Sequence, residues 1–118
     1  MRRTIVIVDD HEQFRRSARK LLELEGFHVI GEAADGADGI AAVEHLRPDV
    51  VLLDIGLPDT SGFEIARTLA ATTAVVLVSS RDPSDCTART QRSGACGFVP
   101  KDELSGETLA ALLERGPR

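Results

Sequence analysis

The stretch Val50–Pro58, "VVLLDIGLP", decides the fold of this 118-residue chain. Its first four residues, Val50–Leu53, are all aliphatic, which is typical of a strand that is buried on both faces of a parallel sheet. The carboxylate of Asp54 follows, and a buried carboxylate is costly unless cations or hydrogen-bond donors offset its charge. We therefore expect other polar groups to lie around Asp54.

Segments with the patterns of strands and helices alternate along the whole chain. Apolar runs predict strands, and segments with apolar residues at helical spacing predict helices between and after them. The predicted strands are Thr4–Val8, His28–Ala34, Val50–Leu53, Ala74–Ser79 and Gly97–Pro100. The predicted helices are His11–Gly26, Ala37–Arg47, Gly62–Ala71, Pro83–Ser93 and Ser105–Glu114. This order predicts an α/β fold in which helices cover both faces of a parallel sheet.

Two of these helices carry more specific expectations. In Ala37–Arg47, the side chains of Ile40, Val43 and Leu46 are expected to face the core. The segment Pro83–Ser93 has few large apolar residues, so we expect it to be the least firmly anchored element.

The composition is that of one ordinary soluble domain spanning residues 1–118. The net charge is −5, which disfavours a general nucleic-acid surface, and no apolar run approaches the roughly 20 residues of a membrane helix. The N-terminal apolar run is too short for a signal peptide and ends in acids, so we predict a cytoplasmic protein without a membrane partner. Cys86 and Cys96 have no metal-like or redox-like spacing and are expected to be free thiols.

Polar residues follow or end four of the predicted strands. Asp9 and Asp10 follow the first strand, Asp54 follows the third, Ser79 ends the fourth, and Lys101 follows the fifth. Ligand sites of parallel sheets lie at the carboxyl ends of the strands, so these side chains are expected to converge. Three clustered carboxylates repel one another unless a cation is bound, and hard oxygen ligands suit Mg²⁺. A carboxylate beside Mg²⁺ and a lysine is suited to attack a phosphoryl group.

Each of these residues also has a simpler structural explanation. A single aspartate after a strand is more often a turn or helix cap than a catalyst, and the pair Asp9–Asp10 fits capping as well as chemistry. Ser79 alone would be a structural hydroxyl group, and Lys101 alone would be a surface lysine. Their occurrence at the ends of four different strands favours one shared site.

Four motifs resemble the receiver domain of bacterial two-component response regulators. They are "IVDD" (Ile7–Asp10), "LLDIGLPDTSG" (Leu52–Gly62), "VLVSS" (Val76–Ser80) and "GFVPK" (Gly97–Lys101). They occur in the family's order over essentially the whole chain, which implies a single flavodoxin-like receiver domain. Its fold would be a doubly wound, five-stranded parallel sheet of order 2-1-3-4-5 with five helices, and a receiver protein is a known example of this order.

The resemblance also implies a role for the polar residues. Asp54 would accept a phosphoryl group from a sensor histidine kinase. Asp10 and Asp54 would bind Mg²⁺ directly together with the carbonyl group of Gly56. Asp9 would contact the ion largely through water. Lys101 would contact the phosphoryl oxygens. By this resemblance, the protein is no enzyme beyond its own phosphotransfer and dephosphorylation.

Ser79 and Phe98 are the residues that the resemblance assigns to a switch. Ser79 would bond to the phosphoryl group and move toward it, and Phe98 would turn inward. Phe98 lacks the hydroxyl group of the tyrosine that is more common at this position, and a plain core role for it stays open. The surface of the fourth helix, fifth strand and fifth helix would then change its affinity for an unidentified downstream protein, or form a homodimer on phosphorylation.

The chain departs from the family's pattern near the lysine. Pro100 precedes Lys101 and Asp102 follows it, whereas the family often has a proline after the lysine. The added acid is expected to weaken the pull of Lys101 on phosphate. By the family's pattern, Gly56 and Arg81 flank the path of the attacking water and influence dephosphorylation, in a direction that the sequence does not determine.

Two further polar features are interpreted by default as structural. His11 lies beside the acid pair but shares no metal spacing with His28 or His45, and Mg²⁺ prefers oxygen ligands. The predicted first helix carries a basic stretch that is interpreted as a solvated face or, by the resemblance, as a kinase-docking surface. Its members are Arg15, Arg16, Arg19 and Lys20.

Other functions on a similar fold are also considered. An aspartyl-nucleophile phosphatase needs a second aspartate two residues after the nucleophile, where this chain has Gly56. A flavin or nucleotide binder needs a phosphate loop after the first strand, where Asp9 and Asp10 would repel phosphate. A phosphate relay or a phosphorylation-independent interaction module stays open. The sequence ends at Arg118, soon after the predicted fifth helix, so we expect no DNA-binding domain in it. The chain is expected to be a stand-alone receiver or the receiver part of a longer regulator.

Overall fold

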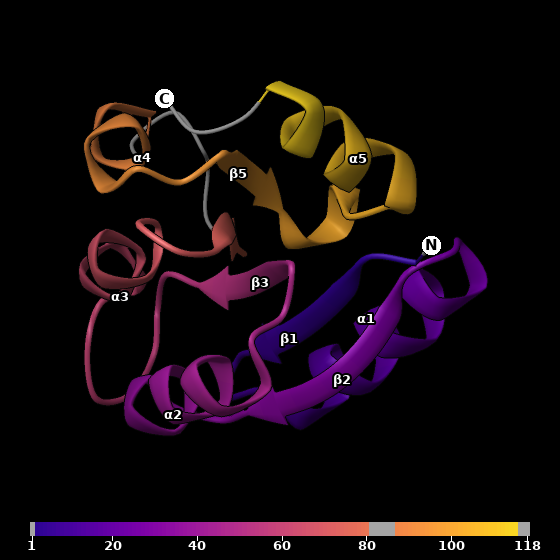
Figure 1. Cartoon of the computed structure of the whole chain (residues 1–118), viewed down its shortest axis with the longest axis horizontal. Helices are drawn as coiled ribbons and strands as arrows, with labels where there is room; N and C mark the ends of the chain where they lie inside the picture. The colour runs from indigo at the N-terminus through magenta and orange to yellow at the C-terminus, as the bar shows by residue number, and fades with distance from the viewer. Residues whose placement is uncertain (1, 81–86, 116–118) are drawn as a thin grey trace.

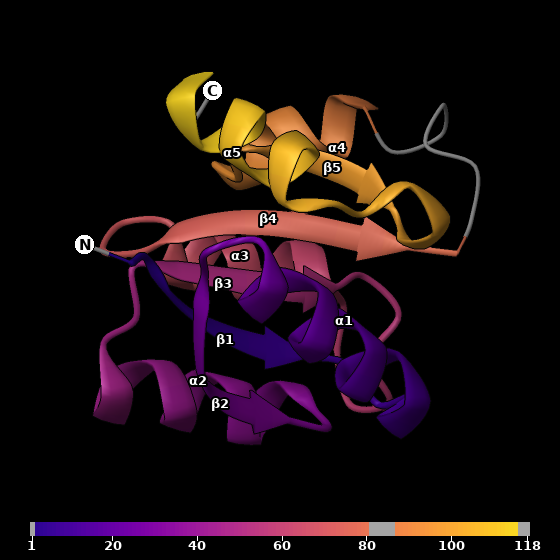
Figure 2. The same ribbon diagram turned by 90° about the vertical axis from the view of Figure 1, so that its right-hand side faces the viewer.

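The five predicted strands form one parallel sheet in the order β2-β1-β3-β4-β5. The computed structural model describes residues 2–80 and 87–115. The strands are β1 (Thr4–Val8), β2 (His28–Ala33), β3 (Val50–Asp54), β4 (Ala74–Ser79) and β5 (Gly97–Pro100). Figure 2 shows their arrows pointing the same way, with β2 at the bottom of the sheet and β5 toward the top. The predicted fold class and strand order are therefore confirmed.

Helices cover both faces of the sheet, as the alternating pattern predicts. They are α1 (Glu12–Leu24), α2 (Gly36–Leu46), α3 (Gly62–Leu69), α4 (Thr87–Ser93) and α5 (Gly106–Arg115), with a short 3₁₀ turn, η2, at Lys101–Glu103. Figure 1 shows α1 and α5 on one side of the sheet and α2, α3 and α4 on the other. Within residues 2–80 and 87–115, no helix is long and apolar enough to cross a lipid bilayer.

Side chains of each central strand alternate between two cores, which explains the unbroken apolar runs. Ile7 packs in one core with Leu22 of α1 and Leu109 of α5. The next residue, Val8, packs in the second core with Phe63 of α3. All five side chains are buried. Because both faces are covered, an inner strand can be apolar at every position, and each fully buried Leu or Ile side chain contributes about 1.5–3 kcal/mol.

The register of the sheet brings the ends of several strands to one edge. Paired residues are Val8 with Leu53, Asp54 with Val78, and Ser79 with Pro100. Strands β1, β3, β4 and β5 therefore end at nearly the same level, although their ends lie far apart in the sequence. The polar residues that end or directly follow these strands share that edge. They are Asp9, Asp54, Ser79 and Lys101.

Carboxylates that accept backbone hydrogen bonds hold the loops beside this edge. Asp59, in the loop after β3, accepts hydrogen bonds from the N–H groups of Gly36 and Ala37 at 2.8 and 3.0 Å. The bond from Gly36 is the main reason why the pKa of Asp59 lies below its usual range. Asp35 caps the same helix, α2, because its side chain accepts from the N–H of Asp38 at 2.8 Å. The loop after β3 is thereby tied to the start of α2, where negative charge is favoured.

The prediction that Leu46 faces the core is wrong. Its side chain is 39% exposed, whereas Val43 of the same helix is buried as predicted. Leu46 lies over Gly31 of the edge strand β2, where an added Cβ would come within 2.6 Å of Leu46 Cδ1. Because β2 is the edge strand, Leu46 covers the edge of the sheet and stays partly in solvent.

The helix predicted at Pro83–Ser93 is described only from Thr87 onward, as α4, and Pro83 lies outside the described residues. In α4 the buried residues are Thr90 and Ser93, both polar. This composition agrees with the prediction of few apolar contacts for this element. The 3₁₀ turn η2 was not predicted.

Only one of the two cysteines lies within the described residues. Cys96 is a buried free thiol, as predicted. Burial raises its pKa above the ordinary value for a thiol. Cys86 lies outside the described residues.

Gly62 forms the closest approach between α3 and the end of β3, and it generates the first prediction. A Cβ added to Gly62 would lie 2.4 Å from the carbonyl oxygen of Asp54 and 2.7 Å from Cα of Ile55. Both are backbone atoms, which cannot rotate away. We expect Gly62→Ala to lower the free energy of unfolding by about 1–3 kcal/mol, measured by urea denaturation followed by circular dichroism.

Gly56→Ala is the matched control for this prediction. Beyond its chain neighbours, the nearest atom to an added Cβ at Gly56 is Asp54 Oδ1 at 4.0 Å, so this variant should unfold close to the wild type. Equal stability of the two variants would contradict the contact assigned to Gly62.

Candidate functional site

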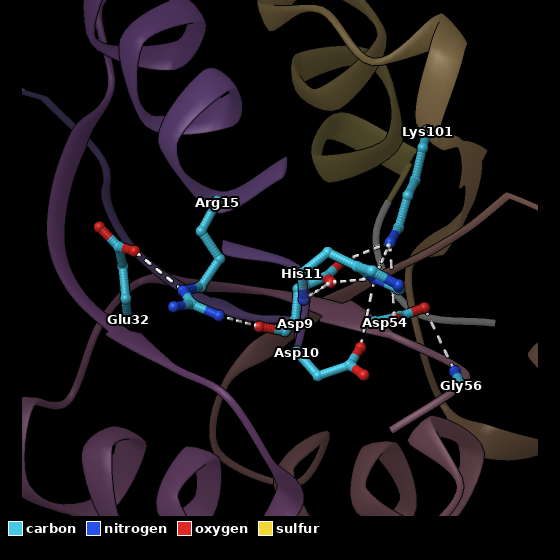
Figure 3. Close-up of polar contacts among 8 residues, drawn as sticks. All are labelled: Asp9, Asp10, His11, Arg15, Glu32, Asp54, Gly56 and Lys101. Carbon is cyan, nitrogen blue, oxygen red and sulfur yellow. Dashed lines mark hydrogen bonds and ion pairs between the residues drawn. The ribbon is translucent and has the colours of Figure 1, made fainter. Parts of the chain in front are cut away.

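Side chains from the ends of two neighbouring strands, β1 and β3, converge in an acidic cluster, defined as Asp9, Asp10 and Asp54. Oxygen atoms of these carboxylates and a ring nitrogen of His11 all lie within 4.8 Å of one another. Lys101, the first residue after β5, extends its ammonium group into the same cluster (Figure 3). The structure thus brings together the acids and the lysine that were predicted from their positions after the strands.

Asp54 lies in an environment that disfavours its charged form. The residue is only 4% exposed, because it ends the central strand β3. Burial raises the pKa of Asp54 above its ordinary value, and the negative charges of Asp9 and, less strongly, Asp10 raise it further. The N–H of Gly56, which donates to Oδ1 at 3.2 Å, and the ammonium group of Lys101 act in the opposite direction. Because the pKa is still raised, these donors offset the charge only in part.

Lys101 is the cation that faces the buried carboxylates. Its Nζ lies 2.7 Å from Asp9 Oδ2 and 3.6 Å from Asp54 Oδ2. The ammonium group also lies 4.6 Å from the centre of the Phe14 ring of α1, where a cation–π contact helps to hold it. The lysine is therefore fixed between two strands and a helix, with its side chain mostly buried.

The structure places His11 beside the acidic cluster, although its spacing from the other histidines in the sequence did not indicate a metal site. Its backbone N–H donates to Asp9 Oδ1 at 2.8 Å. Its ring Nδ1 lies 3.0 Å from the same oxygen, 3.3 Å from Asp10 Oδ1 and 3.4 Å from Lys101 Nζ. The signal that could have found His11 is its position directly after the acid pair, where the chain turns back over the strand end.

Two arginines of α1 are paired within the fold. Arg15 Nε lies 3.1 Å from Glu32 Oε1 of β2, and Arg15 Nη1 donates to the carbonyl oxygen of Asp9 (Figure 3). Arg19 Nη1 lies 2.6 Å from Glu32 Oε2. The interpretation of the basic stretch as a solvated face is therefore wrong for Arg15 and incomplete for Arg19, whereas Arg16 is exposed. Arg15 holds the peptide group that carries Asp9.

The acidic cluster fits a hard divalent cation. Asp9 is fully buried, and among the described residues its Oδ2 has no hydrogen bond of acceptable geometry, although Lys101 Nζ lies 2.7 Å away. A buried carboxylate is costly unless cations offset its charge, and Lys101 is shared between Asp9 and Asp54. Three carboxylates facing one ammonium group leave an excess of negative charge that a dication would offset. Mg²⁺ takes one or two carboxylates directly and completes its octahedral shell with water, so Asp9, Asp10 and Asp54 could hold it.

Three more of the predicted residues lie along or near the same edge. Ser79 ends β4 and is buried. Gly56 follows Asp54 in the next loop, and the role of its carbonyl group as a metal ligand stays a prediction. Phe98 of β5 is partly buried and packs against the core that contains α3. Arg81, predicted to influence dephosphorylation, lies outside the described residues.

Comparisons with known proteins find relatives along nearly the whole chain. The family model described as the response regulator receiver domain matches residues 5–114. The virulence transcription regulator BvgA of Bordetella pertussis is 38% identical over 110 residues, which are 91% of this chain and 53% of BvgA. The response regulator UvrY of Escherichia coli is 31% identical over 112 residues, which are 92% of this chain and 51% of UvrY. The chain thus spans about half the length of these relatives.

Solved structures have the same architecture. The receiver domain of NarL from Mycobacterium tuberculosis matches with a TM-score of 0.85 at 32% identity, covering 96% of this chain and 94% of that domain. A CheY-like receiver protein from Methanospirillum hungatei matches with a TM-score of 0.81 at 24% identity, covering 98% of this chain and 97% of its own. The second likeness supports the fold alone.

The raised pKa of Asp54 predicts a pH-dependent gain of stability in Asp54→Asn. Because the pKa is higher in the folded than in the unfolded protein, ionisation of Asp54 destabilises the fold. This cost is present above the folded pKa and absent below the ordinary value of 3.8. Without divalent cations, Asp54→Asn should therefore melt at a higher temperature than the wild type at neutral pH, and the difference should shrink as the pH falls toward 3.8.

Asp59→Asn is the opposite control. Hydrogen bonds lower the pKa of Asp59 in the folded protein, so its charge stabilises the fold above the ordinary pKa, and this stability is lost as the pH falls through the folded pKa. Asp59→Asn should therefore melt at a lower temperature than the wild type at neutral pH. A melting temperature of Asp54→Asn at or below that of the wild type at neutral pH would contradict the electrostatic account of the cluster.

Proposed function

The chain belongs to the response regulator receiver family, and from this premise we propose that it is a phosphorylation-dependent signalling switch whose phosphoacceptor is Asp54. The observation that carries the proposal is the cluster of buried carboxylates facing Lys101 at the carboxyl edge of the sheet. The proposed donor is a sensor histidine kinase, the proposed cofactor is Mg²⁺, and the proposed location is the cytoplasm. No catalysis beyond its own phosphotransfer and dephosphorylation is proposed.

The nucleophile in this proposal is a carboxylate oxygen of Asp54. It would attack the phosphorus atom of a phosphohistidine, forming an O–P bond while the N–P bond of the donor breaks and its electron pair returns to the imidazole ring. Negative charge is spread over the peripheral oxygens of the group in transfer. The ammonium group of Lys101, 3.6 Å from Asp54 Oδ2, is close enough to pair with one of them. Ser79, at the end of the neighbouring strand β4, would donate a hydrogen bond to another.

Asp9, Asp10 and Asp54 are the proposed holders of Mg²⁺, with the carbonyl group of Gly56 as a further ligand. When bound, the ion supplies positive charge that offsets both the carboxylates and the phosphoryl oxygens. Support for this assignment comes from the three carboxylates that face the ammonium group of Lys101 and from the raised pKa of Asp54. Both indicate a site with too little positive charge in the protein alone.

The proposed output surface is formed by α4, β5 and α5. A surface hollow of about 430 Å³ lies there, lined in part by Thr90 of α4, Phe98 of β5 and Leu112 of α5. Phe98 is only partly buried in it, which suits a side chain that turns inward in one state. The proposed partner is an unidentified downstream protein or a second copy of the chain after phosphorylation. No direct contact of these residues with nucleic acid is proposed, given the net charge of −5.

Acetyl phosphate tests the phosphoacceptor directly. With Mg²⁺ present, the wild type should gain one phosphoryl group by intact-protein mass spectrometry. Asp54→Asn should gain none, because an amide is not a competent nucleophile here. Asp59→Asn is the matched control, since it changes an aspartate in the loop that follows β3, whose carboxylate binds the start of α2. A phosphoryl gain in Asp54→Asn equal to that of the wild type would contradict the assignment of Asp54 as the phosphoacceptor.

Beryllofluoride, a mimic of the phosphoryl group, tests the switch. Hydrogen exchange of backbone amides should change mainly in residues 79–104, beyond the loops that touch Asp54. Ser79→Ala should still accept phosphate at Asp54, because the nucleophile and the metal-binding acids remain, but should lose most of the distant change. If exchange in α4 of the wild type does not respond, the chain carries phosphate without switching, and a phosphate relay becomes the better assignment.

A further inference from the structure

His11 is a nitrogen donor among oxygen ligands, and the proposed function leaves it without a role. Figure 3 shows its imidazole ring beside Asp9 and Lys101, with Asp10 below. Its Nδ1 lies 3.0 Å from Asp9 Oδ1 and 3.3 Å from Asp10 Oδ1. Its backbone N–H donates to the same oxygen of Asp9, so the position of the ring follows from a local turn of the chain.

These separations match those of neighbouring ligands around one ion. In an octahedral site with metal–ligand distances of roughly 2.1 Å, adjacent ligand atoms lie roughly 3.0 Å apart. The three atoms Asp9 Oδ1, Asp10 Oδ1 and His11 Nδ1 already have two such separations. One cation could therefore contact all three after small side-chain movements.

The contacts of Nδ1 in this structure cannot all be hydrogen bonds at once. A bond to the carboxylate of Asp9 needs a proton on Nδ1, whereas a bond from the ammonium group of Lys101, 3.4 Å away, needs a lone pair there. A metal ion would use the lone pair, with the ring proton on Nε2. The side chain of His11 is 65% exposed, so Nε2–H can be solvated in that arrangement.

We propose that His11 is a ligand of the divalent cation site and that this nitrogen makes the site favour borderline transition ions such as Ni²⁺ and Co²⁺ over Mg²⁺. The inference rests on the metal site of the proposed function and adds the class of ion that it takes. Imidazole nitrogen contributes little to the binding of Mg²⁺, whereas mixed nitrogen and oxygen sites bind later first-row ions more tightly. His11 is thus a residue that determines ion specificity.

Calorimetric titration of the wild type and His11→Ala with Mg²⁺ and with Ni²⁺ tests the inference. His11→Ala should weaken Ni²⁺ binding by at least about tenfold, the lower end of the loss that follows removal of even an outer partner of a metal. Its Mg²⁺ affinity should stay within about twofold of the wild type, because Mg²⁺ is held by carboxylates and water. X-ray absorption of the Ni²⁺-loaded wild type should show scattering from an imidazole ligand, and His11→Ala should lack it.

The double variant His28→Ala/His45→Ala is the matched control. Both residues are exposed on other elements, and neither belongs to the described cluster of possible metal ligands. This variant should keep the Ni²⁺ affinity and the imidazole scattering of the wild type. A loss of Ni²⁺ affinity in the double variant, with unchanged Ni²⁺ affinity in His11→Ala, would overturn the inference.

Two further outcomes separate this inference from the proposed function. Unchanged Ni²⁺ affinity in His11→Ala, or an equal loss for Ni²⁺ and Mg²⁺, refutes the ligand role of His11, while Mg²⁺-dependent phosphorylation of Asp54 would leave the proposed function in place. Conversely, Ni²⁺ bound through His11 in a protein that gains no phosphoryl group from acetyl phosphate supports the inference and refutes the proposed function.

Discussion

Repulsion between the buried carboxylates of Asp9 and Asp54 is the constraint on which the rest of the site depends. Asp9 is fully buried and Asp54 nearly so, and after burial itself the charge of Asp9 is the main reason why the pKa of Asp54 is raised. Lys101 lies within 3.6 Å of both but supplies only one positive charge. A neutral site in which every charge is paired would gain little free energy from binding a further ion. A site with an excess of negative charge responds to the arrival of a cation, which is the property that a metal-dependent phosphoacceptor needs.

Contacts to backbone groups hold the acids close together despite this repulsion. Gly62 lies so close to the carbonyl group of Asp54 that the start of α3 is pressed against the end of β3. Asp59 ties the intervening loop to α2, and Arg15 binds the carbonyl oxygen of Asp9 from α1. Flexible loops would relieve the repulsion by moving outward. Because peptide groups on both sides are fixed by helices, the carboxylates remain close together and the unfavourable electrostatic free energy persists in the folded protein.

The strands and the acids that follow them were predictable, because buried parallel strands are read from unbroken apolar runs and their carboxyl ends must share an edge. Asp54 and Lys101 were found in this way. The contacts of Asp59 could not be predicted, because they depend on how a loop meets a helix and leave no periodic pattern. The position of His11 directly after the acid pair was visible in the sequence, but the contacts of its ring depend on one side-chain rotation. Leu46 was misassigned for a related reason. Helical spacing identifies the apolar face of a helix but does not show where the sheet beneath it ends.

Charge balance also explains how the proposed function could reach the distant surface. An acyl phosphate removes the carboxylate charge of Asp54 and places roughly one and a half to two negative charges farther out. If the acidic cluster held a dication, the charge of Asp9 would be offset by that ion as well as by Lys101, and the ammonium group of Lys101 would then be able to pair with the phosphoryl oxygens. Lys101 directly follows β5, and Phe98 lies within that strand. In the proposed switch, a displacement of the lysine would therefore be passed along the backbone of β5 toward the hollow between α4 and α5.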